Sequence, residues 1–225
     1  VAVASNFLAT AEEISAAFSQ KSSVKVIFVS GSTGKLAAQI QQVAPFDVFL
    51  SADRAAPAYL VERGSVEQRK PVTYAIGRLA LYSNDPDLLD SSMDFPELDQ
   101  FKHLAIANPE LAPYGRAARE TLTTLSQWDA LQERIVRGEN IAQTWHFVST
   151  GNADLGLVAL SQLRGKDEIN YRLIPSHLHT PIEQDAILIH DGAMARRFLN
   201  FLSSPHARRI IQSHGYDLPP LTNAK

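Results

Sequence analysis

Short apolar runs alternate with helix-periodic segments from the first residues of the chain, and this alternation limits the possible folds most. Val1–Ala4 is apolar and stops at Ser5-Asn6. The next apolar residues are spaced by four, three and four positions, as on one helix face: Phe7, Ala11, Ile14 and Phe18. Ser5 and Asn6 are residue types that cap helix N-termini. The pattern predicts a strand, a tight turn and a helix.

The same pattern recurs twice in the next 60 residues. Val24–Val29 alternates apolar and polar positions, ends in Ser30–Gly34, and is followed by apolar residues at helical spacing. Phe46–Leu50 predicts a third strand, and a helix then runs to a stop at Gly64. Strands that alternate with helices predict a mostly parallel sheet covered on both faces.

Two extended segments are longer than the usual strand of five to six residues. They are Thr73–Ser83, which contains Gly77, and Ile182–Ile189. We interpret them as two strands that cross between two α/β lobes. The predicted lobe I comprises residues 1–77 and 188–225, and the predicted lobe II comprises residues 78–187.

Composition removes several classes of function. The 225 residues include 21 Lys and Arg against 24 Asp and Glu, a net charge of −3, so no basic field is available for nucleic acid. Cysteine is absent, which excludes disulfides, thiol nucleophiles and cysteine-ligated metals. No apolar run approaches the ~18 residues of a membrane span.

Four strand-to-helix turns carry the candidate chemistry. In open α/β sheets ligands bind beyond the carboxyl ends of strands, where helix N-termini offer free N–H groups and a positive dipole end. Small, neutral or hydroxylic residues dominate these turns, which suits an anion. Taken singly, Ser5-Asn6 is better explained as a helix cap, Ser30–Gly34 as a loop with a capping hydroxyl, and Tyr114 as a partly buried turn residue. The four turns are Ser5-Asn6, Ser30–Gly34, Ala112–Gly115 and Glu139–Ile141.

Evidence for catalysis is weak. Gly-x-Ser-x-Gly, Gly-x-Gly-x-x-Gly, His-Glu-x-x-His and the P-loop pattern are all missing from the sequence. Asp47 and Asp53 could form an acid/base pair, but Asp53 is better explained as the cap of the helix that follows it. His177 and His179 are better explained as loop residues than as metal ligands, because no further ligand stands at a suitable spacing. We therefore expect a binding protein and no enzyme.

Several longer motifs, taken together, resemble the periplasmic molybdate-binding proteins of ABC importers. The similarity runs nearly from end to end. The Ala-Pro-x-Asp-Val-Phe-Leu-Ser-Ala-Asp run and the Asn-Pro…Pro-Tyr-Gly turn are its most specific parts. The motifs are Ala4–Phe7, Ser30–Gly34, Ala44–Asp53, Asn108–Gly115, Ala153–Val158 and His214–Tyr216.

The resemblance implies a type II periplasmic-binding-protein fold, in which two α/β lobes close over one molybdate or tungstate dianion held by neutral donors. Carried over position by position, the implied ligand residues are Ser5, Asn6, Thr33, Tyr114 and Ile141. Contact with the metal is implied only through the oxygens of the oxyanion.

One position departs from the family pattern. Some members have a tyrosine directly after the Leu-Gly-x-Val run, where this chain has Ala159. Tyr114 is present where those members have alanine, so we expect it to replace the missing phenol.

The resemblance also implies a periplasmic location with the signal peptide already removed, a membrane permease as partner, a monomer, and neither a cofactor nor a nucleic-acid partner. Three alternatives remain open. The first is a receptor of the same fold for sulfate, phosphate or ferric iron. The second is an enzyme with a site between the lobes. The third is the ligand-sensing half of a regulator, against which the lack of a basic helix-turn-helix segment counts.

Overall fold

The chain divides into two compact units in the computed structural model, which describes residues 1–22, 24–66, 70–89, 95–96, 100–165 and 171–220. Unit 1 comprises residues 1–77 and 183–225, and unit 2 comprises residues 78–182. The return to unit 1 therefore falls between 182 and 183, ahead of the predicted boundary between 187 and 188. The reason is that Glu183 and Asp185 already bond to Arg54 and Thr73 of unit 1. Residues 221–225 of the predicted lobe I lie outside the described residues.

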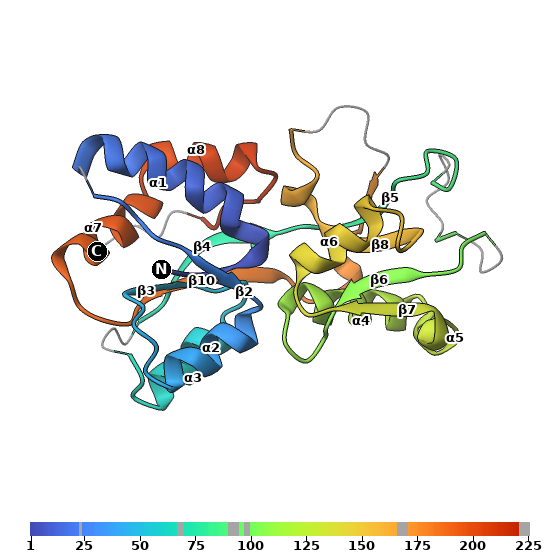
Figure 1. Cartoon of the computed structure of the whole chain (residues 1–225), viewed down its shortest axis with the longest axis horizontal. Coiled ribbons are helices and arrows are strands. Elements are labelled where there is room, and N and C mark those ends of the chain that lie inside the picture. The colour runs from blue at the N-terminus through green and yellow to red at the C-terminus, as the bar shows by residue number, and fades with distance from the viewer. Residues whose placement is uncertain (23, 67–69, 90–94, 97–99, 166–170, 221–225) are drawn as a thin grey trace. The chain divides into compact units, whose positions relative to one another are not determined.

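Unit 1 is built on a five-stranded sheet of order β2-β1-β3-β10-β4. β1 runs parallel to β2 and to β3, and β10 runs antiparallel to β3. The strands are β1 (Ala2–Ala4), β2 (Val29–Gly31), β3 (Val48–Leu50), β4 (Val72–Gly77) and β10 (Ile182–Leu188). One face is covered by α1 (Leu8–Ser22), α7 (Ala193–Leu202) and α8 (Pro205–Ser213), and the other by α2 (Thr33–Gln41) and α3 (Ala55–Glu62) (Figure 1).

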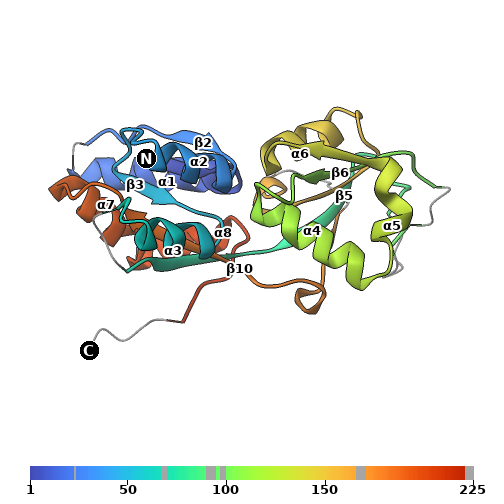
Figure 2. The same ribbon diagram turned by 90° about the horizontal axis from the view of Figure 1, so that it is seen from below.

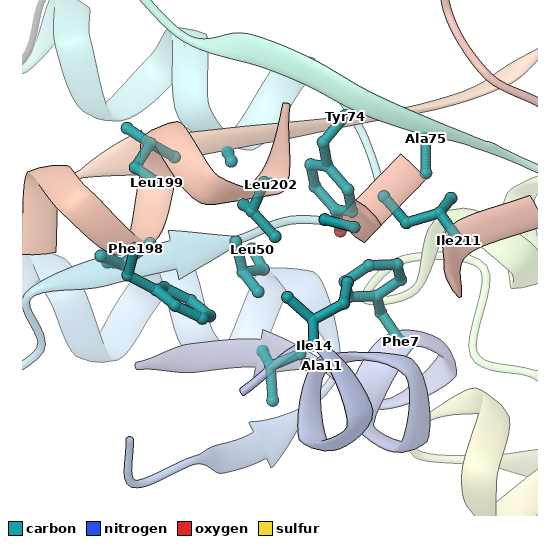
Figure 3. Packing of buried hydrophobic residues seen from close by; sticks show 14 of the residues in the cluster. Phe7, Ala11, Ile14, Leu50, Tyr74, Ala75, Phe198, Leu199, Leu202 and Ile211 are labelled. Carbon is teal, nitrogen blue, oxygen red and sulfur yellow. The ribbon is translucent and has the colours of Figure 1, made fainter. Parts of the chain in front are cut away.

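Alternate residues of the central strands fill the two cores of unit 1. Val3 packs with the α1, α7 and α8 side, whereas Ala2 packs with the α2 and α3 side. Figure 3 shows the first of these cores. The centroid of the Phe7 ring lies 4.7 Å from that of the Tyr74 ring and 5.3 Å from that of the Tyr216 ring. Strands buried on both faces account for the continuous apolar runs in the sequence.

The second predicted strand is wrong in its position. The alternation at Val24–Val29 predicts a strand there, but β2 covers only Val29–Gly31. The pairing with β1 starts with Ala2 opposite Val29. Before this pair, the Val1 amine donates to the Ile27 carbonyl, and the Val29 N–H donates to the Val1 carbonyl. Because β1 is short, it has no residues left to pair with positions 24–26. The turn before α2 is consequently shorter than predicted.

Unit 2 has a second five-stranded sheet, of order β7-β6-β8-β5-β9. Its strands are β5 (Leu79–Ser83), β6 (Leu104–Ala107), β7 (Ile135–Gly138), β8 (Leu155–Ala159) and β9 (Tyr171–Leu173). Helices α4 (Pro113–Thr124) and α6 (Ile141–Ser149) lie on opposite faces of it, and the short α5 (Trp128–Leu131) follows α4 (Figure 2). β6 is parallel to β7 and β8, whereas β5 is antiparallel to β8 and β9.

The predicted fold class, two α/β lobes joined by two crossings, is confirmed. The long run Thr73–Ser83 is divided at Arg78 into β4 of one sheet and β5 of the other. The first strand after each crossing is antiparallel to its neighbours: β5 to β8 and β9, and β10 to β3. Each sheet is therefore mixed. Within the part of the chain that is described, no helix has the length and apolarity needed to cross a membrane.

Candidate anion-binding site

The first predicted turn is a 3-10 helix, η1 (Ser5–Phe7), between β1 and α1. The buried Asn6 side chain donates from Nδ2 to Gln184 Oε1 at 3.0 Å and to the Tyr216 hydroxyl at 3.1 Å. Tyr216 in turn donates to the Asn6 carbonyl at 2.7 Å. Since an amide nitrogen has two hydrogens, these bonds hold the Asn6 side chain inside unit 1. Ser5 is half-buried beside it, and its hydroxyl is not part of this network.

Gln184 is the centre of this network, and our sequence reasoning missed it. It lies on β10 with no exposed surface, and its Oε1 also accepts from the Tyr74 hydroxyl at 3.1 Å. The Tyr74 hydroxyl shares its one hydrogen between Gln184 and the Ser51 carbonyl oxygen, which lies 2.9 Å away. A glutamine within an otherwise buried strand was the available signal, because a buried amide needs hydrogen-bond partners.

The second turn places Thr33 at the first position of α2, with Ser32 as N-cap. Thr33 is buried, and its Oγ1 accepts from the Ala52 N–H at 3.1 Å. A hydroxyl that accepts through a lone pair still has its hydrogen to donate. The Ser32 hydroxyl is also buried and has no hydrogen-bond partner within the described parts of the chain.

Strand order brings the unit 1 residues to one edge. β1 lies between β2 and β3 and is parallel to both, so the segments that follow these three strands emerge at the same carboxyl edge. Ser5 and Asn6 follow β1, and Thr33 comes two residues after β2. The 3.1 Å bond from Ala52 to Thr33 joins the segment after β3 to this edge.

Tyr114 is the second residue of α4, behind Pro113, and is almost fully buried. The start of this helix lies against the end of β6. A Cβ added at Gly115 would stand 2.3 Å from the Ala107 carbonyl oxygen, so only glycine permits this approach. Ala159, at the end of β8, is fully buried and offers no polar side chain. That Tyr114 replaces the phenol which other family members have at the position of Ala159 stays a prediction.

Ile141 is the first residue of α6. The Asn140 side chain caps the N–H groups of Ala142 and Gln143, each at 3.0 Å, and the Thr144 N–H bonds to the Asn140 carbonyl. Among the residues that the structure describes, the Ile141 N–H has no acceptor. The turn therefore presents a main-chain donor at Ile141.

The unit 2 residues also share an edge. β6 and β7 are parallel neighbours, and the Asn108 N–H bonds to the Gly138 carbonyl at 2.7 Å beyond them. The α4 turn follows β6 and the α6 turn follows β7, so Tyr114 and Ile141 stand at the same carboxyl edge. Each unit thus gathers its predicted residues at one edge.

The candidate residues of both units are uncharged: Ser5, Asn6, Thr33, Tyr114 and Ile141. Asp53, the alternative acid/base residue, accepts from the Ala56 N–H at 2.9 Å, which confirms its interpretation as a helix cap. No group of three His, Cys, Asp or Glu side chains suited to a metal ion occurs in the portions of the chain described. The chemistry available at these edges is hydrogen-bond donation to an acceptor.

A buried carboxyl group on β10 leads to a prediction about pH. Asp185 accepts from the Thr73 hydroxyl at 2.7 Å, and burial raises the pKa of its carboxyl group above 3.8 despite that bond and the Arg54 charge. The carboxyl group therefore has a higher pKa in the folded chain than in the unfolded chain. Its contribution to stability is fully present at a pH below the unfolded-state pKa and is lost as the pH rises through the folded-state pKa. We expect the free energy of unfolding of Asp185→Asn to fall less between pH 4 and neutral pH than that of the native chain.

Urea unfolding across this pH range measures the effect. Asp129→Asn is the control, because it makes the same substitution at an exposed carboxyl group. A steeper profile for Asp185→Asn, or a variant less stable than the native chain at neutral pH, would contradict the expectation.

Residues 1–217 match the family described as bacterial extracellular solute-binding protein, and the chain belongs to this family. It is 42% identical to the molybdate-binding protein ModA of Rhodobacter capsulatus, over 96% of this chain and 86% of that protein. It is 40% identical to ModA of Azotobacter vinelandii, over 97% and 89% respectively.

Solved structures agree in fold. The periplasmic molybdate-binding protein of Azotobacter vinelandii superposes with a TM-score of 0.89 at 36% identity, covering 97% of this chain and 98% of that one. The sulfate-binding protein SubI of Mycobacterium tuberculosis superposes with a TM-score of 0.73 at 14% identity, over 98% and 86%, which shows a common fold only.

Proposed function

We propose that this chain is the extracytoplasmic receptor that captures molybdate and tungstate for an ABC importer. The observation that carries the proposal is the uncharged donor set at the two sheet edges, in a chain more than 40% identical to a molybdate-binding protein over almost its whole length. The similar proteins of Rhodobacter capsulatus and Azotobacter vinelandii are molybdate-binding proteins, which supports the same ligand.

Neutral donors suit this ligand. A fully deprotonated tetrahedral dianion only accepts hydrogen bonds, so a site made of donors leaves none of its own groups unsatisfied. A ligand that carries a proton would leave a donor facing a donor. At ~2 kcal/mol per bond to a charged group, about six donors supply roughly 12 kcal/mol, which is comparable to nanomolar binding. Neither Lys nor Arg is required.

In this proposal the candidate residues of each unit supply donors to the anion. The side chains of Ser5 and Thr33 belong to unit 1, and Tyr114 and Ile141 belong to unit 2. Both side-chain hydrogens of Asn6 are bonded to Gln184 and Tyr216, so in this proposal Asn6 contributes its main-chain N–H. Binding would shift the chain toward a ligand-bound state that a membrane permease distinguishes from the ligand-free one. The proposal further includes a periplasmic location, a monomeric protein, no cofactor and no catalytic step.

Isothermal titration tests the ligand. We expect molybdate and tungstate to bind at submicromolar concentration, and sulfate and phosphate to bind at least about 100-fold more weakly, a difference of ~2.7 kcal/mol. The reason is that sulfate has the same charge but is smaller, and phosphate carries a proton at neutral pH. Failure to bind molybdate and tungstate, or equal affinity for sulfate, would refute the proposal.

A further inference from the structure

The Gln162 side chain joins the start of α6 to the end of β8. Gln162 ends the short helix η3 (Leu160–Gln162), which directly follows β8. Its Oε1 accepts from the Ala159 N–H at 3.0 Å, and its Nε2 donates to the Ile141 carbonyl at 3.0 Å. One amide group therefore bonds to the main chain of two segments that are 18 residues apart, at Ile141 and Ala159.

These bonds act on the residue that holds the uncapped donor. The Asn140 side chain restrains the first turn of α6 through Ala142 and Gln143. Gln162 restrains it from another side, through the carbonyl of Ile141 itself. With the turn held at these points, the direction of the Ile141 N–H is set before any ligand arrives. Hydrogen bonds weaken steeply when the donor angle is poor, so a fixed direction improves binding.

We propose that Gln162 is a positioning residue for molybdate, which orients the Ile141 N–H toward the anion. Gln162 does not need to touch the anion in this role. The inference rests on the proposed function, because it assumes that the Ile141 N–H binds the ligand.

The first test replaces Gln162 by methionine, which has similar length and neither hydrogen bond. We expect Gln162→Met to weaken molybdate binding about tenfold by titration calorimetry, the scale of one misdirected bond to a charged group. Gln162→Glu is a second variant. It keeps an acceptor for Ala159 but loses the bond to Ile141 and adds a negative charge, so we expect a loss at least as large.

Gln132→Met is the matched control in the same unit. Gln132 is exposed and also donates from Nε2 to a main-chain carbonyl, that of Trp128, at 3.1 Å. It lies outside the four predicted turns. We expect the Gln132→Met variant to bind molybdate with the affinity of the native chain.

A double-mutant cycle distinguishes positioning from a general structural role. Ile141→Pro deletes the N–H at a first helical position, where proline is tolerated, and the extended Asn140 (φ −150°, ψ 174°) suits a residue before proline. Ile141→Ala keeps the N–H and removes only the side chain. We expect Gln162→Met to add no further loss of affinity in the Ile141→Pro background and its full tenfold loss in the Ile141→Ala background.

Three results would overturn the inference. They are native affinity in both Gln162 variants, the same tenfold loss in the Ile141→Pro background, and an equal loss in Gln132→Met. In each case the native chain still binds molybdate, so the proposed function survives. Absence of molybdate binding by the native chain refutes the proposed function instead, and the inference with it.

Discussion

Replacing Thr33 by valine is expected to weaken molybdate binding by about 10- to 150-fold, which corresponds to ~1.5–3 kcal/mol for a hydrogen bond to a charged group. Valine keeps the branched shape of threonine and removes the hydroxyl. Among the described residues, Thr33 Oγ1 only accepts a hydrogen bond, from the Ala52 N–H, so its hydrogen is the group that an anion would use. Titration calorimetry with molybdate measures the loss.

Two controls accompany this variant. Thr33→Ser keeps the hydroxyl and should bind molybdate within about twofold of the native chain, since either side chain offers one O–H. Thr10→Val removes another fully buried hydroxyl of unit 1, which has no partner among the described residues. Thr10→Val should leave the affinity for molybdate unchanged. It should not reduce the free energy of unfolding, because the hydroxyl that it removes makes no hydrogen bond in the described structure. An unaltered Kd in Thr33→Val would remove Thr33 from the site.

Replacing Gly115 by alanine is expected to lower the unfolding free energy by about 3 kcal/mol, as for an overpacked site that cannot relax freely. The new Cβ would lie 2.3 Å from the Ala107 carbonyl oxygen and 2.7 Å from the Asn108 carbonyl carbon. Both atoms belong to the main chain, so no side-chain rotation relieves the contact and the start of α4 must move. Tyr114 would move with it, and we expect weaker molybdate binding as well.

The sign of the stability effect makes this test specific. Elsewhere in a helix, glycine to alanine stabilises by up to ~1 kcal/mol. Gly192→Ala is the matched control at the N-cap of α7, where the added Cβ would meet only the Ala195 Cβ at 4.0 Å. It should be nearly neutral. Urea unfolding of both variants checks the expectation, and a Gly115→Ala variant as stable as the native chain would contradict the close approach of α4 to β6.

Local signals in the sequence located most elements of the fold. The spacing of Phe7, Ala11 and Ile14 predicted α1 because helix periodicity is a property of neighbouring residues. Asp53 was correctly interpreted as a cap for the same reason, since its partner Ala56 is three residues away. The strand predicted at Val24–Val29 was misplaced, because its extent depends on β1, which begins at the other end of α1.

The candidate site divides in the same way. Its residues were named from turn motifs and from resemblance to a family, and the structure gathers them at one sheet edge in each unit. The residues that hold them were missed. Gln184 bonds to Asn6 from 178 positions away, and Gln162 bonds to Ile141 from 21 positions away. No periodicity or spacing rule reaches across such separations.

By itself, the sequence determined the alternating α/β architecture, the uncharged turns and the family. These depend on interactions between residues a few positions apart and on motifs kept in order along the chain. Only the tertiary structure decided how each polar group is used: the Asn6 side-chain amide is bound inside unit 1, the Thr33 hydroxyl keeps its hydrogen, and the Ile141 N–H has no acceptor among the described residues. The physical reason is that strand order and register, which join distant segments, choose the partner of each donor.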